Sequence, residues 1–337
     1  MVSVEGSVRV DLLGGTLDIS PINLILKNAL TLNVATSLKA KVEISNLDKE
    51  GIEIHSLDYK TTKYFPSEDF TFQKLESGAF GPFAFLGRIL FHLKINRGVS
   101  LHLSSGSPPG AGLGGSSAMG VTFYKALLKY LGDEASHEEI VRVVGNIESK
   151  SLDCGPTGYQ DYYPALYGGI LALIPEMKGV KVEQLFTPEL ANSLENHLTL
   201  VSSEESRFSG LNNWEVIKKF FDKDPEIREG LKSIANLTFK AYEALQQKDY
   251  ASLFKLISLE GEQREKLFPH IVAPSIKELF IKLQKERPHL GMKVCGAGGG
   301  GCFLLVHKPE DQLFIRDYIK EETKMRVLPL RVDEPLQ

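Results

Sequence analysis

The chain has 337 residues, of which 42% are hydrophobic and 24% are charged. Because domains usually hold about 100–200 residues, this length predicts two domains or one two-lobed unit, and the composition supports a sizeable core without long disordered tracts. The formal net charge of −4, without clustered Lys or Arg, argues against nucleic acid as a partner.

The number of cysteines and the lack of long apolar runs indicate the cellular compartment in which the protein is found. The chain has 3 cysteines. An odd number in a long chain, without a CxxC pair, argues against a disulfide scaffold and a zinc site. No apolar run reaches the roughly 18 residues of a membrane span, and Met1–Glu5 lacks the basic start of a signal peptide. We therefore expect a cytoplasmic protein with no membrane partner.

Four segments of the N-terminal half have the alternating or β-branched pattern of strands. They are Val8 to Leu13, Leu30 to Ile44, which forms one or two strands, Ile52 to Tyr59, and Val99 to Leu103. Between the last two, apolar residues recur at helical spacing over Phe83 to Leu93.

A loop made almost entirely of Ser, Gly and Pro follows at residues 104–115, and a helix is expected from about Ser116 to Leu131. Another helix begins near Ser136, because Ser136 and Glu139 match the S-x-x-E capping box. The apolar run Ile170 to Ile174 follows a glycine break.

The C-terminal half is dominated by helical patterns with charged outer faces over residues 212–287. Two apolar runs, Met292 to Cys295 and Cys302 to Val306, follow and are joined by glycines. We place a domain boundary near residues 175–195. The two expected domains are residues 1–180 and residues 181–337.

The glycine loop between the fourth strand and the following helix is the main functional signal. Glycines let a backbone approach a ligand closely, and the helix that follows offers unpaired N–H groups and a positive dipole end. Together they predict an anion site suited to a triphosphate. The expected ATP-binding residues are Pro109, Gly110, Ala111, Gly112, Leu113, Gly114, Gly115, Ser116 and Ser117.

Two other phosphate-binding motifs compete for this loop. Gly110 to Gly115 has the spacing of a Walker A loop, but Ser116 stands where that motif requires lysine. The same loop and the glycine run near residue 300 also fit the dinucleotide fingerprint G-x-G-x-x-G. A Rossmann unit needs a strand, a tight turn and a helix. The first match follows a long Pro-Pro loop and the second precedes a strand, so the context rejects both.

The run from Pro108 to Ala118 resembles the P-x-G-x-G-L-[GS]-S-S-[SA]-A signature of the GHMP kinases, named for galactokinase, homoserine kinase, mevalonate kinase and phosphomevalonate kinase. Three further segments resemble family motifs in the right order. They are Val8 to Asp18, the G-x-Q-D segment Gly158 to Gly169, and the glycine hairpin Lys293 to Cys302. The resemblance spans nearly the whole chain.

This resemblance implies a two-domain α+β fold. The N-terminal domain is expected to be similar to the second domain of ribosomal protein S5, and the C-terminal domain to be ferredoxin-like. ATP and Mg²⁺ are the implied cofactors, with ATP between the domains and the glycine hairpin closing over the phosphate loop. The implied enzyme is a phosphotransferase that moves the γ-phosphate of ATP to a hydroxyl of a sugar or a sugar phosphate.

Asp161 matches the family's catalytic aspartate and is expected to accept the proton of the acceptor hydroxyl. Arg9 would lie beside it, orient its carboxylate and stabilise the transferring phosphoryl group. Ser117 and Glu148 are candidate Mg²⁺ contacts, since Mg²⁺ prefers one or two protein oxygens besides phosphate oxygens and water.

The substrate side is defined less sharply. Asp18 is expected to accept hydrogen bonds from substrate hydroxyls, while Thr16 stands where other branches carry a different polar partner. Arg207 is a candidate contact for an acidic group of the substrate. Gly298 and Gly299 are also assigned to substrate binding.

Several alternatives remain open at this point. The segment from Gly14 to Pro21 and the run Ser206 to Ser209 resemble heptose-phosphate and fucose-kinase-like members, whereas the Pro-Pro-Gly-Ala-Gly-Leu-Gly run is closer to mevalonate kinases. The alternatives are mevalonate kinase itself, an ATP-dependent decarboxylase of the same family that acts on a diphosphorylated mevalonate, and a catalytically inactive nucleotide or sugar sensor. The chain could be a monomer or a homodimer.

Overall fold

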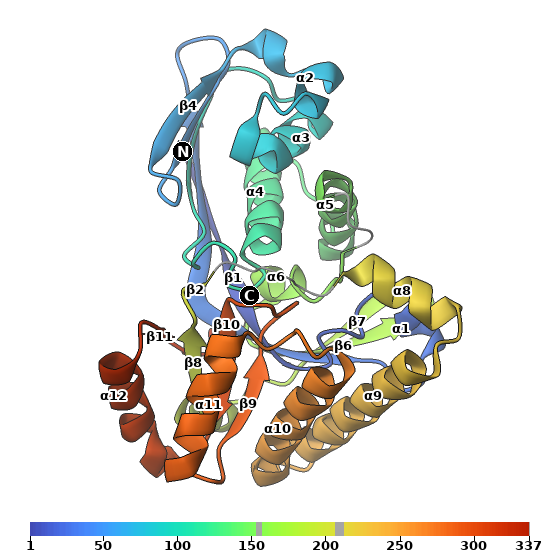
Figure 1. The fold of residues 1–337 in the computed structure, drawn as a ribbon. Coiled ribbons are helices and arrows are strands. Elements are labelled where there is room, and N and C mark those ends of the chain that lie inside the picture. Colours follow the sequence, from blue (N-terminus) through green and yellow to red (C-terminus); the bar gives the residue numbers. More distant parts are fainter. Residues whose placement is uncertain (153–156, 206–211, 337) are drawn as a thin grey trace.

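A computed structural model describes residues 1–152, 157–205 and 212–336 of the chain. It places two β-sheets one above the other, each flanked by helices (Figure 1). Cys154 and the candidate Arg207 lie outside the described residues.

The first sheet is organised around one long strand, β2 (Thr31–Asn46). It pairs along its length with the antiparallel β1 (Val2–Leu13). On its other edge it pairs with β5 (Val99–Ser104) through residues 41–46 and with β6 (Ile170–Glu176) through residues 31–34. The sheet is completed by β3 (Ile52–Ser56), β4 (Thr61–Phe65) and β7 (Gly179–Gln184).

The four strands expected in this half are confirmed, with changes of extent. The first begins at Val2, six residues before the expected start at Val8. The segment expected as one or two strands is the single strand β2. The strand β3 ends at Ser56, three residues before the expected end at Tyr59. The chain turns there, because Lys60 adopts a φ of 49° and its N–H donates to the carbonyl of Leu57.

Four helices lie on one side of the first sheet, some against its strands and some against the other helices (Figure 1). The central one, α4 (Gly115–Leu131), packs against β1 and β2 and buries most of its side chains. The next helix in the chain is α5 (His137–Leu152). It begins after Ser136, whose hydroxyl accepts a hydrogen bond from the N–H of Glu139, as the capping-box pattern predicts. The other two are α3 (Ala84–His92) and α6 (Tyr163–Tyr167). Two short helices are α1 (Ile22–Ile25) and α2 (Phe72–Glu76).

The second sheet confirms the ferredoxin-like expectation. Its order is β11 (Arg326–Leu328), β8 (Leu198–Ser202), β10 (Cys302–Val306) and β9 (Gly291–Val294), all antiparallel. In chain order this is 4-1-3-2 with helices after the first and third strands, which is a β-α-β-β-α-β arrangement. The helices are α8 (Asn213–Phe221), α9 (Pro225–Gln246), α10 (Tyr250–Leu267), α11 (Pro274–Glu286) and α12 (Gln312–Glu322).

The chain passes from the first sheet to the second between residues 184 and 198, through α7 (Pro188–His197). It returns at its C-terminal end, where Asp333 donates its N–H to Ala35 and accepts a hydrogen bond from the hydroxyl of Ser7. The expected division at residues 180 and 181 remains a prediction.

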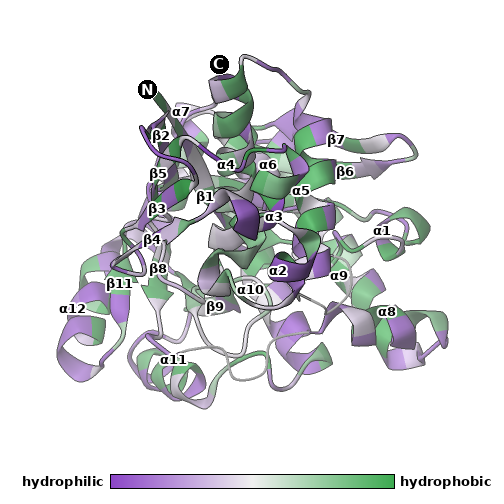
Figure 2. Cartoon of the chain, turned by 90° about the horizontal axis from the view of Figure 1, so that it is seen from above, coloured by the Kyte–Doolittle hydropathy of each residue, from purple (hydrophilic) through white to green (hydrophobic). Residues whose placement is uncertain are grey.

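Both halves contribute to one hydrophobic core, which joins Leu12 and Leu113 to Cys302 and Leu304. Figure 2 shows hydrophilic and hydrophobic residues on each of the peripheral helices α11 and α12, as expected when one helix face is buried. Within the described residues, no helix is long and apolar enough to cross a membrane.

Truncating the core of the second sheet tests this packing. Leu304 of β10 is fully buried, so we expect Leu304→Ala to lower the free energy of unfolding by about 2–5 kcal/mol, because the lost methyl groups leave a cavity. Leu313 of α12 is 69% exposed, and Leu313→Ala is expected to change it by less than about 0.5 kcal/mol. Urea unfolding compares the two, and equal effects would contradict the assigned packing.

Candidate active site

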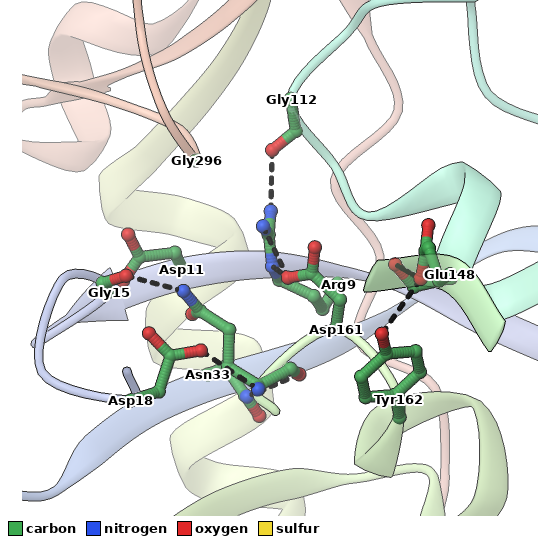
Figure 3. A network of polar contacts seen from close by, with 12 residues as sticks. Arg9, Asp11, Gly15, Asp18, Asn33, Gly112, Glu148, Asp161, Tyr162 and Gly296 are labelled. Carbon is green, nitrogen blue, oxygen red and sulfur yellow. Dashed lines mark hydrogen bonds and ion pairs between the residues drawn. The ribbon is translucent and has the colours of Figure 1, made fainter. Parts of the chain in front are cut away.

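A cleft of about 720 Å³ opens where the two halves meet. The end of β1, the loop before α4 and the first turn of α4 line it, together with the segment before α6. Gly296 and Ala297 of the glycine hairpin complete the lining. Figure 3 shows polar residues of this lining, such as Arg9, Asp18, Glu148 and Asp161, with their neighbours. Every expected ATP-binding residue from Pro109 to Ser117 lies in this lining.

The phosphate loop leads directly into the N-terminal end of α4. Gly114 precedes the helix with a φ of 69°, in the left-handed region that favours glycine, and offers no side chain to cap the helix. A Cβ at this position would lie 2.9 Å from Cγ of Asp161, so the carboxylate sits directly against the start of the helix. The free N–H groups of a helix start suit the anionic phosphates of a nucleotide.

Arg9 and Asp161 form an ion pair in this cleft, as the resemblance implies (Figure 3). Nε and Nη2 of Arg9 lie 2.8 and 2.6 Å from Oδ1 of Asp161. Arg9 also holds the phosphate loop, because its Nη1 donates to the carbonyl of Gly112 and its backbone N–H to that of Leu113. Burial alone lowers the pKa of Arg9, but the carboxylates of Asp161 and Asp11 outweigh it and raise that pKa. The guanidinium is therefore permanently charged.

The two candidate metal contacts are adjacent. The hydroxyl of Ser117 donates to Oε2 of Glu148 at 2.8 Å. Tyr162, which the motif analysis did not single out, donates its hydroxyl to the same oxygen at 2.8 Å. Burial raises the pKa of Glu148, and these two hydrogen bonds offset only part of that rise. The described residues contain no group of three or more acidic, His or Cys side chains that could hold a metal.

Asp18 lies on the other side of Asp161 from Glu148 and is buried (Figure 3). Its Oδ2 accepts a hydrogen bond from the backbone N–H of Gln160 at 3.0 Å. Burial raises the pKa of Asp18 to about 7, and the nearby Asp161 contributes in the same direction. Thr16, two residues before Asp18, is also buried, but it is not part of the cleft lining. Among the described residues, its hydroxyl has no hydrogen-bond partner.

The glycine hairpin packs on the phosphate loop, as the resemblance implies. The N–H of Cys302 donates to the carbonyl of Ala111 at 2.7 Å. Gly298 and Gly299 face elsewhere: a Cβ at Gly298 would collide with Ile271, and Gly299 donates its N–H to the carbonyl of Ile271 at 2.8 Å. Their assigned role in substrate binding stays a prediction.

The cysteines flanking the hairpin are both buried; Cys302 begins β10, whereas Cys295 directly follows β9 and is not a strand residue. Burial raises the pKa of Cys295 to about 12 and also raises the pKa of Cys302. Neither thiol is poised as a nucleophile, because the thiolate is the reactive form.

One part of the cleft lining is apolar and aromatic and includes the buried side chains Phe83, Leu103 and Met119. Asp58 also lines the cleft and accepts hydrogen bonds from the backbone N–H and hydroxyl of Ser105, at 2.8 and 3.1 Å. An apolar slot with one acceptor at its edge suits a flat heteroaromatic ring. No residue of this part was singled out from the sequence, because its members come from a short helix, a strand and α4, which share no common motif.

Two family models match the chain, and together they cover more than half of it. The model of the GHMP kinases N terminal domain matches residues 83–169, and the model of the GHMP kinases C terminal domain matches residues 241–324. The chain belongs to the GHMP kinase family. Members of this family are phosphotransferases that act on hydroxyl groups with ATP as donor, and this chain is such an enzyme.

The curated relatives include both sugar and mevalonate kinases. The chain is 26% identical over 326 residues to a bifunctional fucokinase/GDP-fucose pyrophosphorylase of Arabidopsis thaliana, covering 92% of this chain but only 30% of that protein. It is 28% identical over 293 residues to a mevalonate kinase of Saccharolobus solfataricus, covering 86% of each. It is 29% identical over 226 residues to a D-glycero-alpha-D-manno-heptose 7-phosphate kinase of Campylobacter jejuni, covering 66% of each.

Solved structures confirm the two-domain GHMP kinase fold. A mevalonate kinase structure matches with a TM-score of 0.75 at 21% identity, covering 99% of this chain and 100% of that one. A D-glycero-D-manno-heptose 1-phosphate kinase of Bacteriodes thetaiotaomicron matches with a TM-score of 0.74 at 20% identity, covering 99% and 97%. Because these relatives act on different acceptors, the acceptor of this GHMP kinase has to be inferred from the residues that line its own cleft.

The raised pKa of Asp18 gives folding stability a defined pH dependence. Its carboxyl has a pKa near 7 in the folded chain and near 3.8 in the unfolded chain, so only the folded state holds the proton between these values. The contribution of this group to the free energy of unfolding therefore falls as pH rises from about 4 to about 7. We expect Asp18→Asn to gain stability relative to wild type between pH 4 and pH 8, by up to about 4 kcal/mol.

Urea unfolding of wild type and Asp18→Asn at both pH values measures this difference. Asp48→Asn, at an exposed aspartate, is the control and should show no such trend. A stability difference for Asp18→Asn that does not vary with pH would contradict the assigned burial.

Gly301 tests the contact between the hairpin and the phosphate loop. It has a φ of 75°, and a Cβ there would lie 2.7 Å from the carbonyl oxygen of Gly110. Gly132, at the far end of α4, has nearly the same φ of 76° with nothing within 4 Å. We expect Gly301→Ala to displace the loop and weaken ATP binding roughly tenfold, about 1.4 kcal/mol.

Gly132→Ala carries the same backbone strain without the collision, so it should leave the affinity for ATP unchanged. Titration calorimetry with ATP measures both variants. Equal dissociation constants for the two would show that the contact does not shape the nucleotide site.

Proposed function

We propose that this GHMP kinase transfers the γ-phosphate of ATP, in the presence of Mg²⁺, to a hydroxyl of a sugar or sugar phosphate. The observation that carries the proposal is the Arg9–Asp161 pair, which lies in the cleft at the N-terminal end of α4 and is bound to the phosphate loop. Phosphoryl transfer needs mainly positioning and charge stabilisation, and this arrangement supplies both.

The proton of the acceptor hydroxyl passes to Asp161 in this proposal. Both contacts from Arg9 use Oδ1 of Asp161, and within the described part of the chain no hydrogen bond to Oδ2 is found. Oδ2 can therefore accept the proton while the new O–P bond forms and ADP leaves. Arg9 holds the carboxylate in place and stabilises the charge that develops on the transferring group.

Ser117 and Glu148 are the residues that would hold Mg²⁺. Their oxygens lie 2.8 Å apart at the start of α4, beside the expected position of the phosphates. One carboxylate and one hydroxyl fit a metal that takes its remaining ligands from phosphate and water. When bound, Mg²⁺ neutralises charge on the phosphates. Burial raises the pKa of Glu148, and its carboxylate forms no ion pair within the described part of the chain, so a bound cation would supply the counter-charge.

Hydroxyl groups are favoured over a carboxylate as the substrate groups that lie beside Asp18. Asp18, Asp161 and Glu148 lie together in the cleft lining. Carboxylates accept hydrogen bonds from hydroxyls, whereas a carboxylate substrate beside them would be repelled. The fucokinase and heptose 7-phosphate kinase relatives support the same choice.

Mevalonate kinase is the second candidate, because a mevalonate kinase relative matches 86% of this chain. The charges around Asp18 weigh against it, since mevalonate carries a carboxylate. The intact pair of Arg9 and Asp161 weighs against an inactive sensor, which would be free to lose its base.

A panel of acceptors tests the proposal. The purified chain would be incubated with ATP and Mg²⁺ and with hexoses, fucose, heptose phosphates or mevalonate, and product would be followed by ³¹P NMR. We expect a phosphomonoester with one of the sugars. Phosphorylation of mevalonate alone would favour the second candidate, and release of carbon dioxide from a diphosphorylated mevalonate would reveal a decarboxylase. No product from any acceptor would contradict the proposal.

Asp161→Asn tests the assigned base. The amide keeps the shape but cannot take the proton, so we expect kcat to fall by roughly 10²–10⁴ while the ATP dissociation constant changes little. Asp48→Asn is the matched control and should leave both unchanged. Turnover by Asp161→Asn at the wild-type rate would remove Asp161 from the mechanism.

A further inference from the structure

Beneath the cleft lies a group of charged side chains that the reaction above does not use. Asp11, Glu260, Arg264 and Lys293 have exposed fractions of 0 to 1%. They come from β1, α10 and β9, so they join the two halves of the fold. We refer to these four residues as the buried ion cluster.

Lys293 is the centre of the buried ion cluster. Its Nζ lies 3.2 Å from Oδ2 of Asp11 and 2.7 Å from Oε2 of Glu260. Nη1 of Arg264 lies 3.5 Å from the same oxygen of Asp11. Burial alone raises the pKa of Asp11, but Lys293, Arg264 and Arg9 outweigh it and lower that pKa. The cluster thus joins two basic side chains to two acidic ones.

Stability alone does not account for such a cluster. Desolvating a charge costs several kcal/mol even in real proteins, and replacing a buried ion network by apolar side chains is often neutral or stabilising. What the ions do provide is a fixed geometry, because each partner accepts only a narrow range of positions. The buried ion cluster contacts two backbone segments, and these are the segments whose positions it fixes.

One of those segments is the turn that leads to Asp18. The backbone N–H of Gly14 donates to Oε1 of Glu260 at 3.2 Å. Gly15 lies so close to the cluster that a Cβ there would be 2.1 Å from Oδ2 of Asp11. The turn at residues 14–18 is thus set by a helix of the other half of the molecule. Figure 3 shows Asp11 and Gly15 beside Asp18.

The other segment is the glycine hairpin. Arg264 donates to the carbonyl of Val294 at 3.2 Å and to that of Gly296 at 2.7 Å. The hairpin in turn donates from Cys302 to the phosphate loop. Asp11 also shares a face of β1 with Arg9, two residues earlier, which binds the carbonyl of Gly112 in that loop.

We infer that Asp11 and Lys293 are positioning residues that couple the turn at residues 14–18 to the glycine hairpin, so that the acceptor site is held in register with the phosphate loop. Neither side chain lines the cleft, so both act through the turn and the hairpin. The inference rests on the proposed placement of the acceptor at Asp18. A displacement of about 1 Å by a change remote from the reacting atoms can lower a rate by up to 10²-fold.

Three variants separate this role from a structural one: Asp11→Asn, Lys293→Met and the double variant. Each single change leaves one uncompensated buried charge, so both should lower the urea midpoint. The double variant restores the net charge but leaves Glu260 and Arg264 without their ion-pair partners, so we expect it to recover only part of the midpoint. Its kcat/KM for the acceptor should nevertheless stay roughly 10- to 100-fold below wild type, with the ATP dissociation constant within about threefold. Lys277→Met, which breaks an exposed ion pair with Glu265, is the control and should leave all readouts unchanged.

Hydrogen exchange gives a readout that needs no acceptor. In the double variant, amides of residues 14–18 and of the hairpin should exchange several-fold faster than in wild type, while those in the middle of α4 should not. Wild-type exchange in both segments together with wild-type kcat/KM would overturn the inference. If wild type phosphorylates no sugar, the proposed function fails, and the exchange result alone decides the coupling: unchanged exchange overturns it and faster exchange supports it.

Discussion

The ion pair between Arg9 and Asp161 holds together segments that are separated by about half of the chain. Arg9 reaches the phosphate loop through two carbonyls and the carboxylate of Asp161 through two nitrogens. Because Arg9 is buried and its charge is permanent, it fixes the carboxylate where the helix dipole of α4 is positive. Nucleotide site and proposed base are therefore placed by one side chain.

The surrounding carboxylates differ in how their charge is compensated, and this difference separates their proposed roles. Asp161 has a guanidinium partner on one oxygen, while its other oxygen accepts no hydrogen bond from the residues that the structure describes. Glu148 and Asp18 are buried and hydrogen-bonded but form no ion pair among the described residues, and burial raises both pKa values. Glu148 thus suits a metal ion, and Asp18 suits a hydroxyl donor. Deeper in the fold, Asp11 is compensated fully and is assigned to positioning.

Local sequence patterns predicted much of the first half of this fold, because its strands alternate clearly and its loop before α4 is unmistakable in composition. The short strands β4, β8 and β11 were not predicted, since three to five residues carry little periodicity. The ferredoxin-like order followed from the resemblance and not from the strands themselves.

The site likewise contains contacts that the sequence motifs predicted and contacts that they did not. The motifs predicted that Arg9 and Asp161 would meet, and the structure confirms it. Nothing in the sequence paired Asp11 with Lys293, because 282 positions separate them. Their position within apolar strand segments was the available signal, since a charge buried in a strand needs a partner. Tyr162 was overlooked for a related reason: its contact with Glu148 depends on how α5 packs against α6.

The most direct test is a crystal structure with Mg²⁺ and a non-hydrolysable ATP analogue. We expect the triphosphate along the amides of residues 110–117, with the terminal phosphorus facing the carboxylate of Asp161 across a gap that admits one hydroxyl group. A nucleotide bound outside this cleft, or a terminal phosphate directed away from Asp161, would contradict the assignment of the active site.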